Sequence, residues 1–146
     1  MRRFRFRLAS LLRLRSQIER SARKELALAM AEVNNFDQQL AAAVQGLVDC
    51  ADQAARSDSV GFLARSLEAG LRRHQYRLIQ QRKAAEQKLD VVRVEYTQKA
   101  RELKTLQRLR DQEHSEWTTE MQRSEQAELD EMALLSRGRE QGEDQW

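Results

Sequence analysis

The chain has 146 residues, of which 34% are charged and 5% aromatic, with five glycines and no proline. This composition excludes an ordinary compact domain, because the aromatic residues are sparse and few residues could form its turns. Proline inside a helix costs ~3 kcal/mol, so a chain without it can remain helical almost from end to end. We therefore predict an all-α fold, built as one elongated coiled-coil unit over residues 1–146.

The net charge of +3 conceals a division into four blocks. Residues 1–24 carry a net charge of +8 and residues 25–59 one of −5, while residues 60–110 carry +8 and residues 111–146 carry −8. Segregation of this kind favours contacts through particular ends and faces of the chain.

The first helix is expected at about residues 3–56. From Leu26 onward, alternating steps of three and four residues meet only apolar side chains, which is typical of a coiled-coil seam. Upstream the stripe passes through Ile18 and Ala22 with two successive steps of four, which predicts a stutter that locally unwinds the supercoil. The regular positions are Leu26, Ala29, Val33, Phe36, Leu40, Ala43, Leu47, Cys50 and Ala54.

Ser, Asp and Gly cluster only once, between residues 57 and 61. We expect a turn at about residues 57–60, with a helix N-cap among residues 57–59. A second helix is then expected over about residues 60–136, followed by a polar tail at 137–146. Its apolar stripe near the turn is predicted to be Leu63, Leu67, Leu71, His74 and Leu78. His74 is either a seam residue bonded to the facing helix or a partner contact.

A short turn makes the two helices antiparallel and pairs positions whose residue numbers sum to about 116. That register places the acidic first helix beside the basic start of the second, which supports the alignment. The second helix is the longer one and leaves an acidic extension from about Asp111. Trp117 and Met121 on this extension have no predicted partner, which suggests either a docking surface or a tail that doubles back or dimerises.

The sequence offers little for catalysis. Cys50 is the only cysteine, and His74 and His114 lie forty residues apart, so no metal site, cofactor site or catalytic group is predicted and we expect no enzyme activity. Phe4 and Phe6 interrupt the basic residues at the start, which argues against nucleic-acid binding. A membrane-surface helix or targeting segment within residues 1–18 is an alternative. No membrane span is predicted.

Three segments carry a resemblance to a known family. The first is Phe4-x-Phe6-Arg7-Leu8-x-x-Leu11-Leu12-x-Leu14-Arg15, continued by Glu19, Ala22 and Leu26-Ala27. The second runs from Leu67 to His74, and the third includes Tyr96 to Leu109 and Glu116-Trp117 up to Leu129-Asp130-Glu131. Together with the position of the turn, they resemble the FliJ family, small coiled-coil components of the bacterial flagellar type III export apparatus.

The resemblance implies a function as well as a fold. It implies an antiparallel coiled coil similar to the central shaft of the rotary ATP synthase, binding the hexameric export ATPase, the export-gate membrane protein and substrate chaperones. The gate contact would be Leu63, Leu67, Gly70 and His74. Where family members can carry aromatic residues on the facing helix, this chain has Gly46 and Cys50. The end near the termini would offer the ATPase ring Phe4, Phe6, Arg7, Leu12, Arg13 and Trp117.

These implications place the protein in the cytoplasm, peripherally attached to the inner face of the cell membrane at the flagellar base, where it would serve flagellum assembly and motility. Two alternatives have the same architecture. One is a stalk protein of a virulence-type III secretion system, and the other is a generic coiled-coil scaffold or chaperone.

Overall fold

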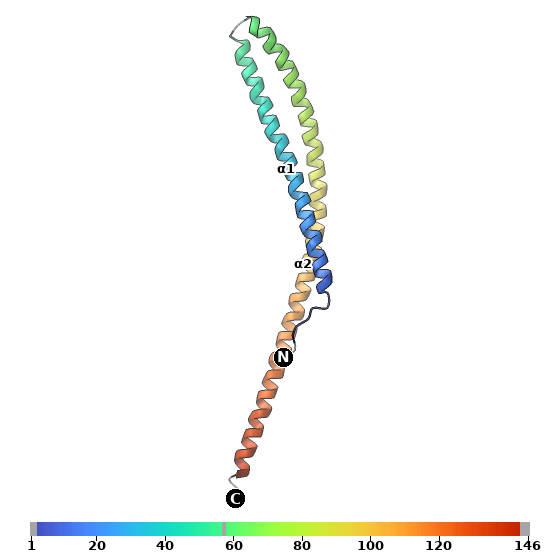
Figure 1. Ribbon diagram of the computed structural model, residues 1–146, viewed down its shortest axis with the longest axis vertical. Coiled ribbons are helices and arrows are strands. Elements are labelled where there is room, and N and C mark those ends of the chain that lie inside the picture. The colour runs from blue at the N-terminus through green and yellow to red at the C-terminus, as the bar shows by residue number, and fades with distance from the viewer. Residues whose placement is uncertain (1–2, 57, 144–146) are drawn as a thin grey trace. The chain divides into compact units, whose positions relative to one another are not determined.

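The computed structural model describes residues 3–56 and 58–143 of the chain. They form two helices, α1 (Ala9–Ala54) and α2 (Asp58–Glu143), and this part of the chain contains no strand (Figure 1). With 86 residues, α2 is almost twice as long as α1, which has 46. The predicted all-α hairpin with a longer second helix is confirmed. None of the helices in the described ranges is long and apolar enough to cross a membrane.

Contacts divide the chain into two units, and both helices run through both of them. One unit comprises Ser16–Arg101, and the other comprises the residues up to Arg15 together with those from Glu102 onward. The first unit contains the turn and the antiparallel helix pair, whose two arms lie side by side in Figure 1. The second contains the start of the chain and the C-terminal part of α2.

Small and branched apolar side chains form the seam of the unit Ser16–Arg101. Leu78 is the most deeply buried of them, with 2% of its surface exposed. Burying a leucine contributes ~1.5–3 kcal/mol, and the alanines let the helix axes approach closely. The buried apolar residues of this unit are Ala22, Ala29, Ala43 and Cys50 on α1 and Ala64, Leu78, Ala85 and Leu89 on α2.

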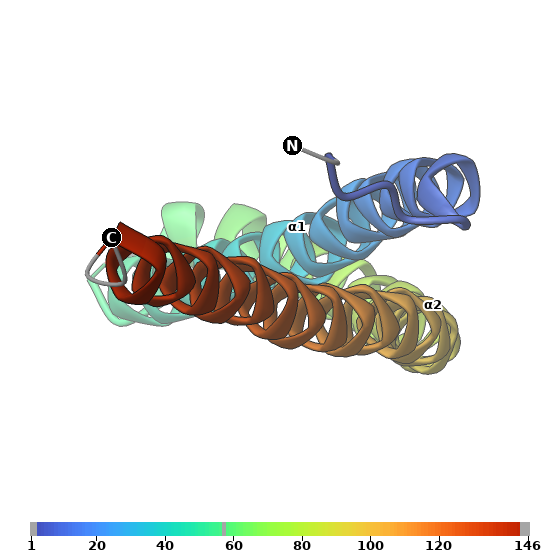
Figure 2. The same ribbon diagram turned by 90° about the horizontal axis from the view of Figure 1, so that it is seen from below.

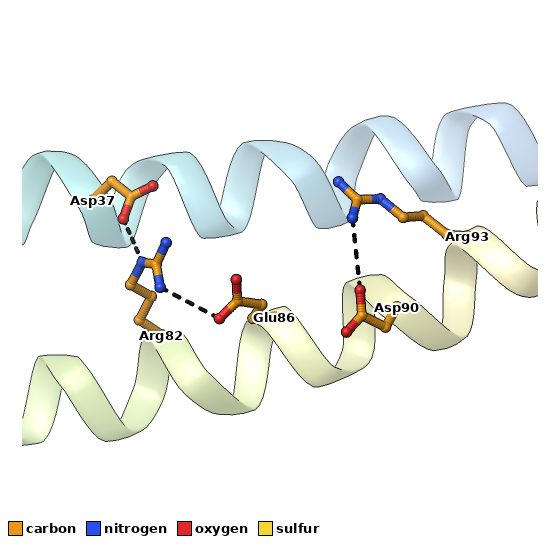
Figure 3. Close-up of polar contacts among 5 residues, drawn as sticks. All are labelled: Asp37, Arg82, Glu86, Asp90 and Arg93. Carbon is orange, nitrogen blue, oxygen red and sulfur yellow. Dashed lines mark hydrogen bonds and ion pairs between the residues drawn. The ribbon is translucent and has the colours of Figure 1, made fainter.

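Polar contacts across the seam fix the register of the two helices. Arg82 pairs with Asp37 and also reaches Glu86, with Nη1 3.4 Å from Oε2, as Figure 3 shows. Lys88 Nζ lies 3.7 Å from Glu32 Oε2. The interhelical pairs join residues whose numbers sum to between 115 and 120, close to the predicted 116. These exposed pairs contribute alignment more than stability.

The helix boundaries differ from the prediction at three places. Helix α1 begins at Ala9 rather than near residue 3, and the segment before it leaves the helix as an irregular chain in Figure 2. The turn is slightly earlier than expected, with Ala55 and Arg56 outside α1. Helix α2 continues to Glu143 instead of ending near residue 136, because Gly138 costs a solvated helix only ~1 kcal/mol. The side chains of the predicted N-cap, residues 57–59, lie outside the described part.

The predicted seam near the turn is right at Leu71 and Leu78 and wrong at Leu63, Leu67 and His74. Leu63 and Leu67 are 68% and 58% exposed, and His74 is also exposed, whereas Gly61 and Ala64 are buried. Apolar residues near the turn lie on two adjacent stripes of α2, an exposed one with Leu63 and Leu67 and an inner one that faces α1. The inner stripe continues with alternating steps of four and three residues to Leu89. This inner stripe is Ala64, Glu68, Leu71, Gln75, Leu78, Arg82, Ala85 and Leu89.

The predicted stutter in α1 is also wrong. Glu19 is buried, with 5% of its surface exposed, while Ile18 is only half-buried. With Glu19 in the seam, the steps from Arg15 through Ala22 to Leu26 alternate regularly between four and three. The charged Glu19, rather than the apolar Ile18, therefore occupies the seam position in this turn of α1.

Candidate interaction surfaces

The start of the chain is held by an aromatic cluster. The Phe4 ring lies edge-on to His114, with ring centroids 4.9 Å apart and an interplanar angle of 87°. It also lies 5.8 Å from Trp117, and the His114 and Trp117 rings are 5.9 Å apart. Edge-to-face and tilted pairs at these distances are favourable. The predicted lack of an intramolecular partner for Trp117 is therefore wrong, and the unpaired part of α2 begins later than Asp111.

The backbone explains why the start of the chain reaches this cluster. Residues 3–6 are not helical, the amide of Ala9 donates to the carbonyl oxygen of Phe6 at 3.3 Å, and α1 starts there. Arg15 and Glu102 form an ion pair a few turns away. The segment before α1 is thus fixed between an aromatic contact and the first helical turn.

The residues expected to contact the ATPase ring all belong to this same unit. The exposed members are the two cations Arg7 and Arg13. The four apolar members are half-buried: Phe4, Phe6, Leu12 and Trp117. The structure thus brings Phe4 and Trp117 into contact and leaves the two guanidinium groups accessible to a partner.

The residues expected to contact the export gate follow one face of α2. Leu63, Leu67 and His74 are exposed and Gly70 is half-buried, with no atom within 4 Å of a Cβ built on it. Spacings of four, three and four residues place them on one side of the helix. Because the seam uses Ala64 and Leu78 instead, this apolar stripe is left accessible.

Gly46 and Cys50 on α1 belong to the seam. A Cβ at Gly46 would lie 3.4 Å from Leu71 Cδ1, and Cys50 is buried with 4% of its surface exposed. Both positions face α2, so they leave little surface on this side of α1 for a partner.

Glu19 forms a buried polar node that the apolar pattern could not reveal. Its Oε1 accepts hydrogen bonds from Arg23 Nη2 at 2.6 Å and from the Tyr96 hydroxyl at 3.2 Å. The hydrogen bond to Glu19 raises the pKa of Arg23 above its usual value, so this guanidinium stays charged. The one available signal is the i,i+4 spacing of Glu19 and Arg23.

The C-terminal part of α2 presents a fully exposed surface. From residue 122 to residue 139 every residue is exposed, although Met121 just before is half-buried. Apolar side chains stand here among carboxylates: Leu129, Met132, Leu134 and Leu135 are each at least 60% exposed. Within the described residues this helix does not double back, because it runs unbroken to Glu143.

The described residues hold no group of three or more side chains that could bind a metal ion. The ion pairs join arginines or lysines to carboxylates along and across helices, and the pairs between α1 and α2 fix the register of the two helices.

Comparison with known protein families matches residues 4–142 to the family described as "Flagellar FliJ protein". The chain belongs to the FliJ family. The match covers nearly the whole chain, so the resemblance stated from the sequence is confirmed. No curated protein and no solved structure matches the chain. Membership makes this chain a component of the flagellar export apparatus, which favours the flagellar interpretation over the virulence-system alternative.

Proposed function

We propose that this FliJ-family chain binds the hexameric flagellar export ATPase as a central-stalk-like coiled coil and links it to the export gate and to substrate chaperones. The observation that carries the proposal is the family match across residues 4–142. The role needs no catalysis, because a stalk that binds successive ring states with different affinities shifts their populations. The protein acts in the cytoplasm at the inner face of the cell membrane, in flagellum assembly and motility.

The unit that holds the start of the chain supplies the proposed ATPase contact. Arg7 and Arg13 are accessible there, and Phe4 is positioned by its contact with Trp117. Two exposed guanidinium groups can pair with carboxylates of the ring subunits. Trp117 then acts mainly by holding the irregular segment in place.

The direct test measures ATP hydrolysis by the purified export ATPase with and without the chain, at matched ionic strength because low salt exaggerates charge-driven contacts. We expect binding and stimulation, both lost in the double variant Arg7→Ala/Arg13→Ala. The control is Arg20→Ala/Arg108→Ala, which removes the same charge from exposed helix positions. A generic scaffold predicts dimerisation and no effect on the ATPase.

The exposed stripe of α2 supplies the proposed gate contact. Leu63 and Leu67 offer apolar area that the seam does not use, and His74 adds a polar group on the same face. We expect the triple alanine variant of these residues to lose capture of the cytoplasmic part of the export gate. Leu28→Ala is the matched control, because Leu28 is 71% exposed on the other helix. Equal loss in the control would contradict the assignment.

A further inference from the structure

The face of α2 that points away from α1, between Phe62 and Lys83, has a composition that neither the seam nor the proposed partner contacts explain. We call it the back face and define it by its exposed residues Phe62, Arg65, Arg73, Tyr76, Arg77 and Lys83. Inward positions of the same stretch, such as Ala64 and Leu78, are buried against α1. The back face is thus on the opposite side of the helix from the seam.

The four cations of the back face form no ion pair within the described part of the chain, whereas the neighbouring Arg72 and Arg82 do. Between residues 62 and 83 the only acidic residue of α2 is Glu68, and it binds Arg72 with Nη2–Oε1 at 2.7 Å. Arg82 is paired with Asp37 of α1. In the described part of the chain, Arg65, Arg77 and Lys83 make no ion pair, and Arg73 donates only to the carbonyl oxygen of Ala69.

Two aromatic rings stand among these cations. Phe62 is 75% exposed and Tyr76 is 64% exposed, so neither contributes its ring to the seam. Tyr76 borders a shallow groove of about 660 Å³, which is lined by Gly70, Arg72, Arg73, Tyr76 and Arg77. The helix rise of ~1.5 Å per residue makes the whole face roughly 30 Å long.

We propose that the back face binds the surface of an anionic lipid bilayer. Arginine and lysine are attracted to anionic headgroups, and aromatic side chains are favoured at the headgroup level. Because these cations lie along one face of a single helix, they can approach a planar surface together. An acidic partner helix fits less well, because the positions between Phe62 and Tyr76 on this face offer no large apolar side chain to form a second seam.

The proposed binding is electrostatic and adds to the function proposed above without depending on it. Phe62 and Tyr76 provide little apolar area compared with a membrane-inserting helix, so binding should weaken steeply as salt is raised. The stripe of Leu63, Leu67, Gly70 and His74 lies on the adjacent side of α2, so lipid and a protein partner can bind together. Failure to bind the ATPase would leave this proposal standing.

The test is co-sedimentation of the full-length chain with vesicles of phosphatidylcholine alone or mixed with phosphatidylglycerol. We expect binding only to the mixed vesicles. Each arginine near an anionic surface contributes about a fivefold factor, so the variant Arg65→Gln/Arg73→Gln/Arg77→Gln should bind roughly 100-fold more weakly. Phe62→Ala should bind several-fold more weakly. Far-ultraviolet circular dichroism checks that the helices persist in both variants.

Two control variants make the result specific. Arg20→Gln/Arg108→Gln/Arg123→Gln removes the same charge from exposed positions elsewhere and should retain most of the binding. Arg3→Gln/Arg5→Gln/Arg7→Gln tests whether the basic start of the chain is responsible instead. The proposal is overturned if the back-face variant binds like the wild type, or if either control loses as much. Face-dependent binding to single-stranded DNA without binding to anionic vesicles also overturns it.

Discussion

Leu78→Ala tests the position of the seam most sharply, because Leu78 has the smallest exposed fraction among the residues whose burial the structure describes. Truncating a buried leucine to alanine removes its transfer free energy and leaves a cavity, at a cost of about 2–5 kcal/mol in compact cores. A seam between two helices can partly collapse around the cavity because solvent borders both sides. We therefore expect a loss of ~2–3 kcal/mol in the free energy of unfolding.

The matched variant is Leu63→Ala, the same substitution on the same helix. Leu63 is 68% exposed, so its truncation should change the free energy of unfolding by less than ~0.5 kcal/mol. Urea denaturation of both variants, followed by far-ultraviolet circular dichroism, gives the midpoint and the slope. A seam through Ala64 and Leu78 predicts a lower midpoint for Leu78→Ala alone. Equal destabilisation by the two variants would refute this seam.

Three further results are expected. Gly70→Ala should stabilise α2 by up to ~1 kcal/mol, because nothing lies within 4 Å of the added Cβ. Gly46→Ala should stabilise α1 by less, because its Cβ meets Leu71 Cδ1 at 3.4 Å. Thermal melts of the two variants measure the difference in stability. Glu19→Ala should cost ~1–3 kcal/mol in urea denaturation, because it removes a buried hydrogen-bond acceptor, and an unchanged midpoint would argue against the polar node. Trp117→Ala should make the segment before α1 more sensitive to limited proteolysis, and wild-type cleavage rates would contradict the aromatic contact.

The seam positions in the middle of α1 were predictable because every one of them is apolar. From Leu26 to Ala54 every regular position is at least half-buried, and Ala29, Ala43 and Cys50 are fully buried. The register also followed, because a short turn leaves two antiparallel helices little choice of pairing.

The seam near the turn was not predictable from hydrophobicity, because the chain places larger apolar residues beside the seam than within it. Leu63 and Leu67 outrank Ala64 and Glu68 on any apolar scale, yet the structure exposes the leucines. The seam positions near the turn are set by the regular spacing that leads back from Leu78. Placing Leu63 and Leu67 in the seam would break this spacing and rotate the buried Leu78, Ala85 and Leu89 away from α1.

Buried polar and aromatic contacts were missed for a different reason. Glu19 occupies a seam position because Tyr96 and Arg23 supply its hydrogen bonds, and these partners become visible only when the helices are paired. Trp117 finds Phe4 because the start of the chain leaves the helical path before Ala9. A prediction from helical periodicity treats residues 3–8 as part of the first helix, so it could not place the rings of Phe4 and Trp117 together.

We propose above all that this FliJ-family chain engages the flagellar export ATPase. The most direct measurement is the rate of ATP hydrolysis by the purified ATPase as the chain is added, with co-purification of the two proteins at the same ionic strength. We expect a saturable rise in the rate and a stable complex, both weakened in Arg7→Ala/Arg13→Ala. An unchanged rate at every concentration, without co-purification, would contradict it.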